Sequence, residues 1–168
     1  MKSRWIAALL LIAALAGCER GDPAASLVGA WRLVSWEQGA EPGNMRRPYG
    51  ENPEGQLIYT SNGQMAAQLM NPGATLPDVT GSAAEEVLAQ VSTTFFAYYG
   101  TYSVDASAQT VTHHVQGSLA PTWVRSDQVR AFEFLDEDRL QLTAILDEQS
   151  SSELAATGRQ VLVWERIR

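Results

Sequence analysis

The chain has 168 residues, of which 45% are hydrophobic, and its 19 acidic against 12 basic side chains give a formal net charge of −7. This length fits a single domain with one hydrophobic core behind a short N-terminal segment. Because the acidic excess leaves no basic footprint, the composition excludes a protein that binds nucleic acid through a cationic surface.

The first 17 residues have the layout of a bacterial secretory signal peptide. A start with two basic residues is followed by an apolar stretch at 5–14 and then by the sequence LAGC at 15–18. The apolar stretch is too short to cross a bilayer as a helix. The four-residue sequence resembles a lipobox, which implies cleavage before Cys18 and acylation of that cysteine. An ordinary signal peptide with a chance cysteine is the alternative.

Cys18 is the only cysteine, so no disulfide can form within the chain. Acylation would consume a thiol that is a liability in an oxidising compartment. Glu19 follows it, and in the bacterial sorting pattern that this resembles, aspartate there favours the inner membrane. We therefore expect a lipoprotein anchored to the outer membrane through its acyl chains. The small, polar residues 18–26 are expected to form a lipidated tether, with residues 27–168 as the domain.

Within residues 27–168 the dominant hydrophobic period is two, which predicts β-strands. Short turns join many of them, and Asn62-Gly63 is the strongest hairpin signal in the chain. The predicted strands are residues 27–37, 55–59, 63–70, 98–104, 110–116, 128–135, 139–146 and 160–167.

Residues 82–97 break this alternation. Ser82 can cap a helix, two glutamates follow in its first turn, and apolar residues recur at helical spacing. The chain is thus expected to be all-β, with one helix inserted before the fourth strand. Eight antiparallel strands joined by hairpins favour an up-and-down barrel over a β-sandwich. The interior of such a barrel either holds one small ligand or is filled by side chains.

An ordered set of short blocks resembles the lipocalin-like domain family of bacteria and fungi. The first block is LVGAWRLVSWE at 27–37, and others are NPEG at 52–55, YGTY at 99–102, VTHHV at 111–115 and LVWER at 162–166. The resemblance covers nearly all of the domain and implies a lipocalin-like barrel with a ligand-sized interior, but no settled reaction. The sequence departs from the family at Val124-Arg125, where a glycine-bearing turn is expected.

The resemblance also implies how the barrel closes. In lipocalins the tryptophan matched by Trp31 lies at the closed base, and an arginine from the last strand, matched by Arg166, stacks over it. Such a cation–π contact contributes about 0.5–2 kcal/mol. The alternative is that Arg166 is an exposed surface residue.

His113 and His114 are the only histidines. Adjacent strand residues point to opposite faces, so they cannot readily share a metal, and no other metal-ligand spacing is present. The apolar neighbours at 111 and 115 predict that His113 faces inward. It could be a hydrogen-bonded core residue, a ligand-binding group or a catalyst.

Four further residues are candidate ligand contacts. Tyr59 and Tyr102 combine a large apolar body with a polar tip, Met65 is an adaptable apolar group, and Arg47 in the first long loop could meet a carboxylate. The alternatives are ordinary strand residues, a core filler and a solvated loop charge.

Three functions stay open, and no motif points to a cofactor, a nucleotide or an activated serine. The first is an envelope lipoprotein that binds a small apolar or amphipathic ligand in its barrel. The second is a cavity enzyme of isomerase, cyclase or dehydratase type, with His113 as acid or base. The third is a structural or interaction domain with a filled barrel, which would lack a cavity of about 300 Å³.

Overall fold

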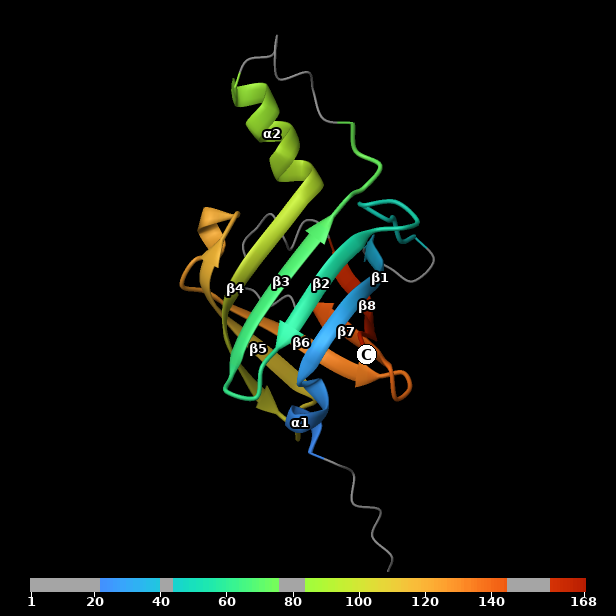
Figure 1. Ribbon diagram of the computed structural model, residues 1–168, viewed down its shortest axis with the longest axis vertical. Coiled ribbons are helices and arrows are strands. Elements are labelled where there is room, and N and C mark those ends of the chain that lie inside the picture. The colour runs from blue at the N-terminus through green and yellow to red at the C-terminus, as the bar shows by residue number, and fades with distance from the viewer. Residues whose placement is uncertain (1–21, 40–43, 76–83, 145–157) are drawn as a thin grey trace, which may run out of the picture.

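The computed structural model describes residues 22–39, 44–75, 84–144 and 158–168. These residues form eight antiparallel strands in which each strand pairs with its neighbours in sequence and β1 pairs with β8, so that the barrel is closed (Figure 1). The predicted eight-stranded up-and-down barrel is therefore confirmed. The strands are β1 (Gly29–Gly39), β2 (Glu54–Tyr59), β3 (Gln64–Met70), β4 (Phe95–Asp105), β5 (Thr110–Ser118), β6 (Asp127–Phe134), β7 (Arg139–Ala144) and β8 (Arg159–Arg166).

The two ends of the barrel differ. The short helix α1 (Pro23–Leu27) and the turns at 60–63, 106–109 and 135–138 lie at one end, here called the closed end. The opposite end, here called the open end, carries the longer connections, which include α2 (Ala84–Thr94) and the 3₁₀ turn η1 (Pro121–Trp123) (Figure 1).

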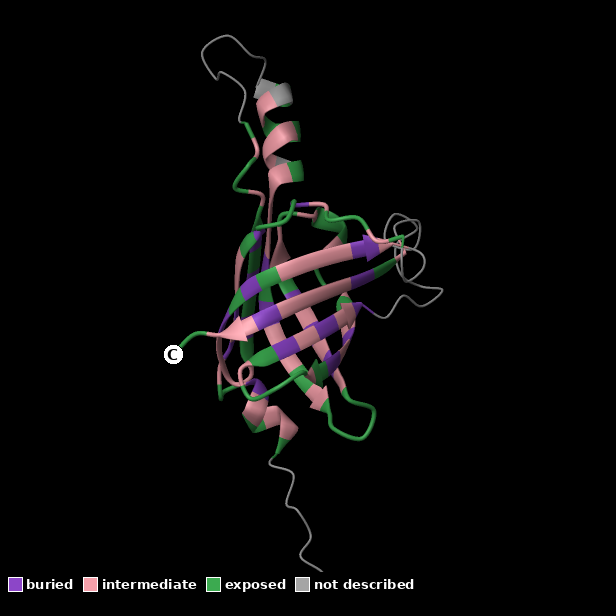
Figure 2. Cartoon of the chain, turned by 90° about the vertical axis from the view of Figure 1, so that its right-hand side faces the viewer, coloured by how far each residue is buried: buried purple, intermediate pink, exposed green. Residues whose placement is uncertain are grey.

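Alternating burial along the strands builds the core (Figure 2). In β3 the buried residues Met65, Ala67 and Leu69 alternate with exposed ones. In β5, His113 is only 1% exposed and its neighbours at 111 and 115 are also buried. The predicted phase of β5, with His113 inward and His114 outward, is confirmed.

A β-bulge breaks this alternation in β1. The pairing of β1 with β8 shifts by one residue between Leu33 and Ser35. Leu33 faces the core, so strict alternation would turn Ser35 inward as well. The extra residue reverses the phase, as bulges do, and Trp36 packs against the core instead.

Residues 23–27 form α1, although the sequence analysis assigned them to the tether and the first strand. Pro23 suits the first helical position, and the Asp22 carboxylate accepts a hydrogen bond from the Ala24 amide at 2.9 Å. Leu27 is fully buried, and its carbonyl oxygen accepts a hydrogen bond from Trp31 Nε1 at 2.9 Å. The helix therefore packs over the closed end.

The helix before the fourth strand is present but shorter than the predicted 82–97. It ends at Thr94, and β4 begins at Phe95 with no loop between them. Phe95 and Phe96 pair with the end of β3 and therefore belong to the sheet, although their spacing in the sequence also suited a helix. The expected cap, Ser82, lies outside the described residues.

The departure from the family pattern at Val124-Arg125 has a structural counterpart. Arg125 has a φ of 66°, a left-handed conformation that glycine adopts most easily. The loop nevertheless keeps its hydrogen bonds, since the Arg125 amide donates to the Val115 carbonyl at 2.9 Å. The expected turn is formed, with an arginine in the position that favours glycine.

The signal peptide at 1–17 and the acylation site Cys18 lie outside the described residues and stay predictions. Within residues 22–39, 44–75, 84–144 and 158–168, neither helix is both long enough and apolar enough to span a bilayer.

Candidate functional site

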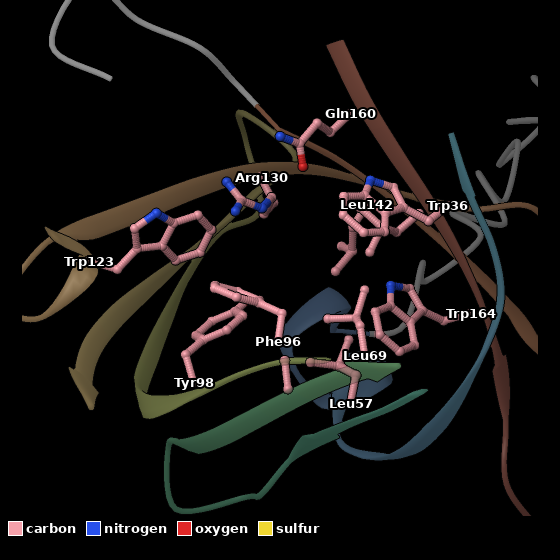
Figure 3. A pocket seen from close by; sticks show the side chains of 12 residues that line it. Trp36, Leu57, Leu69, Phe96, Tyr98, Trp123, Arg130, Leu142, Gln160 and Trp164 are labelled. Carbon is pink, nitrogen blue, oxygen red and sulfur yellow. The ribbon is translucent and has the colours of Figure 1, made fainter. Parts of the chain in front are cut away.

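The barrel contains a cavity of about 50 Å³ in its half nearer the open end (Figure 3). Its wall is largely apolar and consists of side chains from seven strands and η1. The aliphatic and phenyl groups belong to Leu57, Ala67, Leu69, Phe96, Leu142 and Leu162. The indole and polar groups belong to Trp36, Trp123, Trp164, Tyr98, Arg130 and Gln160.

Arg130 on β6 is the cationic group of this cavity. It is 6% exposed, and its guanidinium carbon lies 5.7 Å from the centroid of the Trp123 ring. One terminal nitrogen donates to the Val129 carbonyl at 3.0 Å. No carboxylate among the described residues forms an ion pair with Arg130. Because a buried charge is costly without a partner, this group is an unusual one to keep in an apolar wall.

Next to the cavity, two tyrosines hold His113 between them. The Tyr98 hydroxyl lies 2.9 Å from Nδ1, and the Tyr59 hydroxyl lies 2.6 Å from Nε2. Both ring nitrogens are therefore engaged. Tyr98 also lines the cavity, so this hydrogen-bonded row connects the barrel interior to the site.

Electrostatics keep this row neutral. Burial, followed by the charges of Arg130 and His114, holds the pKa of His113 well below its ordinary 6.5. Burial raises the pKa of Tyr59 well above 10.0. Burial also raises the pKa of Tyr98, while the charge and hydrogen bonding of Arg130 oppose that rise. A neutral imidazole donates through one nitrogen and accepts through the other, so the two tyrosines play opposite roles.

The cavity also has two indole groups, which lie on its far side from Arg130 (Figure 3). The Nε1 atoms of Trp36 and Trp164 are buried and have no hydrogen-bond partner among the described residues. Indole N–H and guanidinium groups only donate hydrogen bonds, whereas tyrosine and glutamine can also accept them. The cavity is therefore rich in donors.

The structure places the predicted ligand contacts away from this cavity. Tyr102 packs on Tyr59, with 4.7 Å between ring centroids, and its hydroxyl donates to the Thr60 carbonyl near the closed end. Met65 is a buried core residue. Tyr59 contacts both His113 and Tyr102 and pairs with Met65 across β2 and β3, and none of the four belongs to the cavity lining. Their roles as ligand contacts stay predictions.

Arg47 lies apart from the other four predicted contacts. It forms ion pairs with Glu37, at 3.0 Å, and with Glu51 on the outside of the barrel. Arg130, Trp36 and Trp164 were not predicted from the sequence to be site residues. Alternation could have indicated Arg130 from its neighbours in β6, but the bulge in β1 hides the inward phase of Trp36.

A second row of polar groups lies on the outer face. The Ser103 hydroxyl is 2.9 Å from His114 Nε2, and His114 Nδ1 is 2.7 Å from the Asp127 carboxylate. The order resembles that of a serine nucleophile and its base, but the side chains of His114 and Asp127 are 41% and 62% exposed. Water competes for each of these hydrogen bonds, so the row does not preorganise a nucleophile. No group of three or more potential metal ligands occurs in the described part of the chain.

Known proteins show one family match and two structural likenesses to this chain. A family model described as a lipocalin-like domain matches residues 28–167. Among solved structures, a redesigned β-barrel is 10% identical, with a TM-score of 0.42, over 86% of this chain and 95% of that one. A structure of EF1p2_mFAP2b bound to DFHBI is 14% identical, with a TM-score of 0.43, over 86% and 96% of the two chains. The search of curated proteins found no match.

Proposed function

The chain belongs to the lipocalin-like domain family, and from this premise we propose that it is an envelope lipoprotein whose barrel binds a small apolar or amphipathic molecule. The observation that carries the proposal is the cavity, which combines an apolar wall with a few buried polar groups. That combination is typical of small-molecule sites, where apolar area supplies affinity and polar groups orient the ligand.

The size of the cavity limits the ligand. Its volume of about 50 Å³ is well below the range of roughly 300–1,000 Å³ found for drug-sized ligands. The site therefore suits a compact molecule, and a larger one requires side chains such as Trp36 or Trp123 to move. The same observation favours a second candidate function, an interaction domain with a filled barrel.

The proposed anchor is compatible with access to the cavity. The chain enters the barrel through α1, which packs at the closed end (Figure 1). A short tether from an acylated Cys18 would therefore hold the closed end toward the membrane. The open end, nearer the cavity, would face the periplasm.

No observation in the described site favours the cavity enzyme. His113 was its candidate acid or base, yet both of its ring nitrogens are hydrogen-bonded to tyrosines and it does not line the cavity.

A pair of neighbouring alanines tests cavity binding. Ala67 lines the cavity, whereas Ala66 is exposed on the outer face of the same strand. The soluble chain from residue 19 onward keeps every described residue and would be examined by non-denaturing mass spectrometry. We expect a small molecule to remain bound, Ala67→Leu to remove it by filling the cavity, and Ala66→Leu to retain it. If no molecule is bound to the chain that carries neither substitution, the result would favour an interaction domain with a filled barrel.

A further inference from the structure

We propose that the ligand of this barrel is a small carboxylate with an apolar body, bound with its carboxylate at Arg130 and a second oxygen acceptor at the indole groups of Trp36 and Trp164. This inference rests on the proposed binding function and specifies the chemical class of the ligand.

Arg130 supplies the first argument. Its guanidinium group is buried in an apolar wall, packs against Trp123, donates a hydrogen bond to a backbone carbonyl and interacts with Tyr98. Guanidinium carries five N–H donors in a planar fork that matches a carboxylate. A carboxylate in the cavity would both neutralise the buried charge and accept from the remaining donors. A single guanidinium matches a monoanion better than a phosphate dianion.

The row of hydrogen bonds beside the cavity also favours an anionic ligand. If Tyr59 donates to His113 Nε2, then His113 donates from Nδ1 to the Tyr98 oxygen, and the Tyr98 hydroxyl proton is left to point elsewhere. Tyr98 lines the cavity beside Arg130, so its proton can be donated to the same anion. In this arrangement each donor in the row strengthens the next.

The two indole groups supply the third argument. A buried N–H without a hydrogen-bond partner is destabilising, and Trp36 and Trp164, which both line the cavity, each have one. A ligand with an oxygen acceptor on that side would satisfy them. Because both ends of the cavity offer donors, the preferred ligand is one that brings acceptors to both.

Three matched probes test the inference in the soluble chain from residue 19 onward. Hexanoate and 1-hexanol share an apolar body and differ in charge, and 5-oxohexanoate adds a carbonyl oxygen. All three are larger than the cavity of about 50 Å³, so each requires Trp36 or Trp123 to move when it binds. Binding would be measured by calorimetry and by the fluorescence of the cavity tryptophans. We expect hexanoate to bind at least about tenfold tighter than 1-hexanol, the size of one charged hydrogen bond. We expect 5-oxohexanoate to bind tighter still.

Substitutions of Arg130 test whether it causes the tighter binding of hexanoate than of 1-hexanol. Arg130→Gln should remove the advantage of hexanoate over 1-hexanol, and Arg130→Lys should keep part of it. Arg139→Gln, in an exposed ion pair at the closed end, is the charge-matched control and should keep all of it. Retained binding of 1-hexanol to Arg130→Gln shows that the variant is folded.

Two further comparisons test the roles of the Tyr98 hydroxyl and of the indole groups in binding the probes. Tyr98→Phe should reduce the advantage of hexanoate severalfold, whereas Tyr99→Phe, on the exposed outer face, should not. Trp36→Phe should remove the gain of 5-oxohexanoate over hexanoate. Equal binding of hexanoate and 1-hexanol would overturn the carboxylate inference and leave cavity binding intact. Failure of all three probes to bind would overturn both.

Discussion

The guanidinium group of Arg166 lies over the ring of Trp31, with 4.0 Å between its central carbon and the ring centroid. Its two terminal nitrogens donate to the carbonyl oxygens of Val28, at 3.0 Å, and Ser26, at 2.7 Å. One side chain of β8 thus joins the start of β1 and α1 at the closed end. Gly29 makes room for it, since a Cβ atom there would come within 2.9 Å of the guanidinium group.

Replacing Arg166 should weaken this closure. Arg166→Ala removes the cation–π contact and two charge-assisted hydrogen bonds, and we expect the free energy of unfolding to fall by about 2–3 kcal/mol. Urea denaturation measures it. Arg168→Ala is the control, because its exposed ion pair with Asp138 should contribute less than about 1 kcal/mol. Equal losses in the two variants would contradict the closure role.

Burial of neutral His113 should make stability depend on pH. Because its pKa is held below 6.5 in the folded chain, the unfolded chain takes up a proton first as the pH falls. The stabilisation that comes from keeping His113 neutral in the folded chain is present above about pH 6.5. As the pH falls below that value, the free energy of unfolding decreases by up to about 1.4 kcal/mol per pH unit. Urea unfolding between pH 7.5 and 5 should show this slope. It should diminish in His113→Gln and persist in His114→Gln, and an unchanged slope in His113→Gln would refute the assignment.

The left-handed backbone at Arg125 predicts a stabilising substitution. A φ of 66° destabilises a residue that has a Cβ atom by about 1 kcal/mol, whereas glycine adopts it without this penalty. Part of the gain is offset by the larger entropy of glycine in the unfolded chain. We expect Arg125→Gly to raise the free energy of unfolding by about 0.5 kcal/mol. Arg125→Ala removes the same side chain but keeps Cβ, so a similar gain there would rule out backbone strain as the cause.

The proposed anchor predicts the behaviour of Cys18. Cys18→Ser should abolish incorporation of labelled fatty acid and leave the chain with its signal peptide uncleaved. Metabolic labelling followed by mass spectrometry of the N-terminus checks both results. Label on the serine variant, or none on the original chain, would be inconsistent with a lipoprotein.

The sequence by itself determined the strands, their order and the closed barrel. Alternation has a period of two, so an inward phase can be assigned wherever one face is apolar, as at His113. Short hairpins then leave few topologies for eight consecutive strands. Local pattern failed where two structures compete for the same residues, as at Phe95 and Phe96, because pairing with β3 decides the end of α2.

Only the tertiary structure decided which inward residues share a level of the barrel. His113 and Arg130 both point inward, yet Arg130 lines the cavity and His113 does not. Arg130 pairs with Val111, two residues before His113, and this register is set by the pairing of β5 with β6, which neither strand encodes alone. The bulge at Leu33 likewise turned Trp36 inward, because one unpaired residue reverses the phase of everything after it.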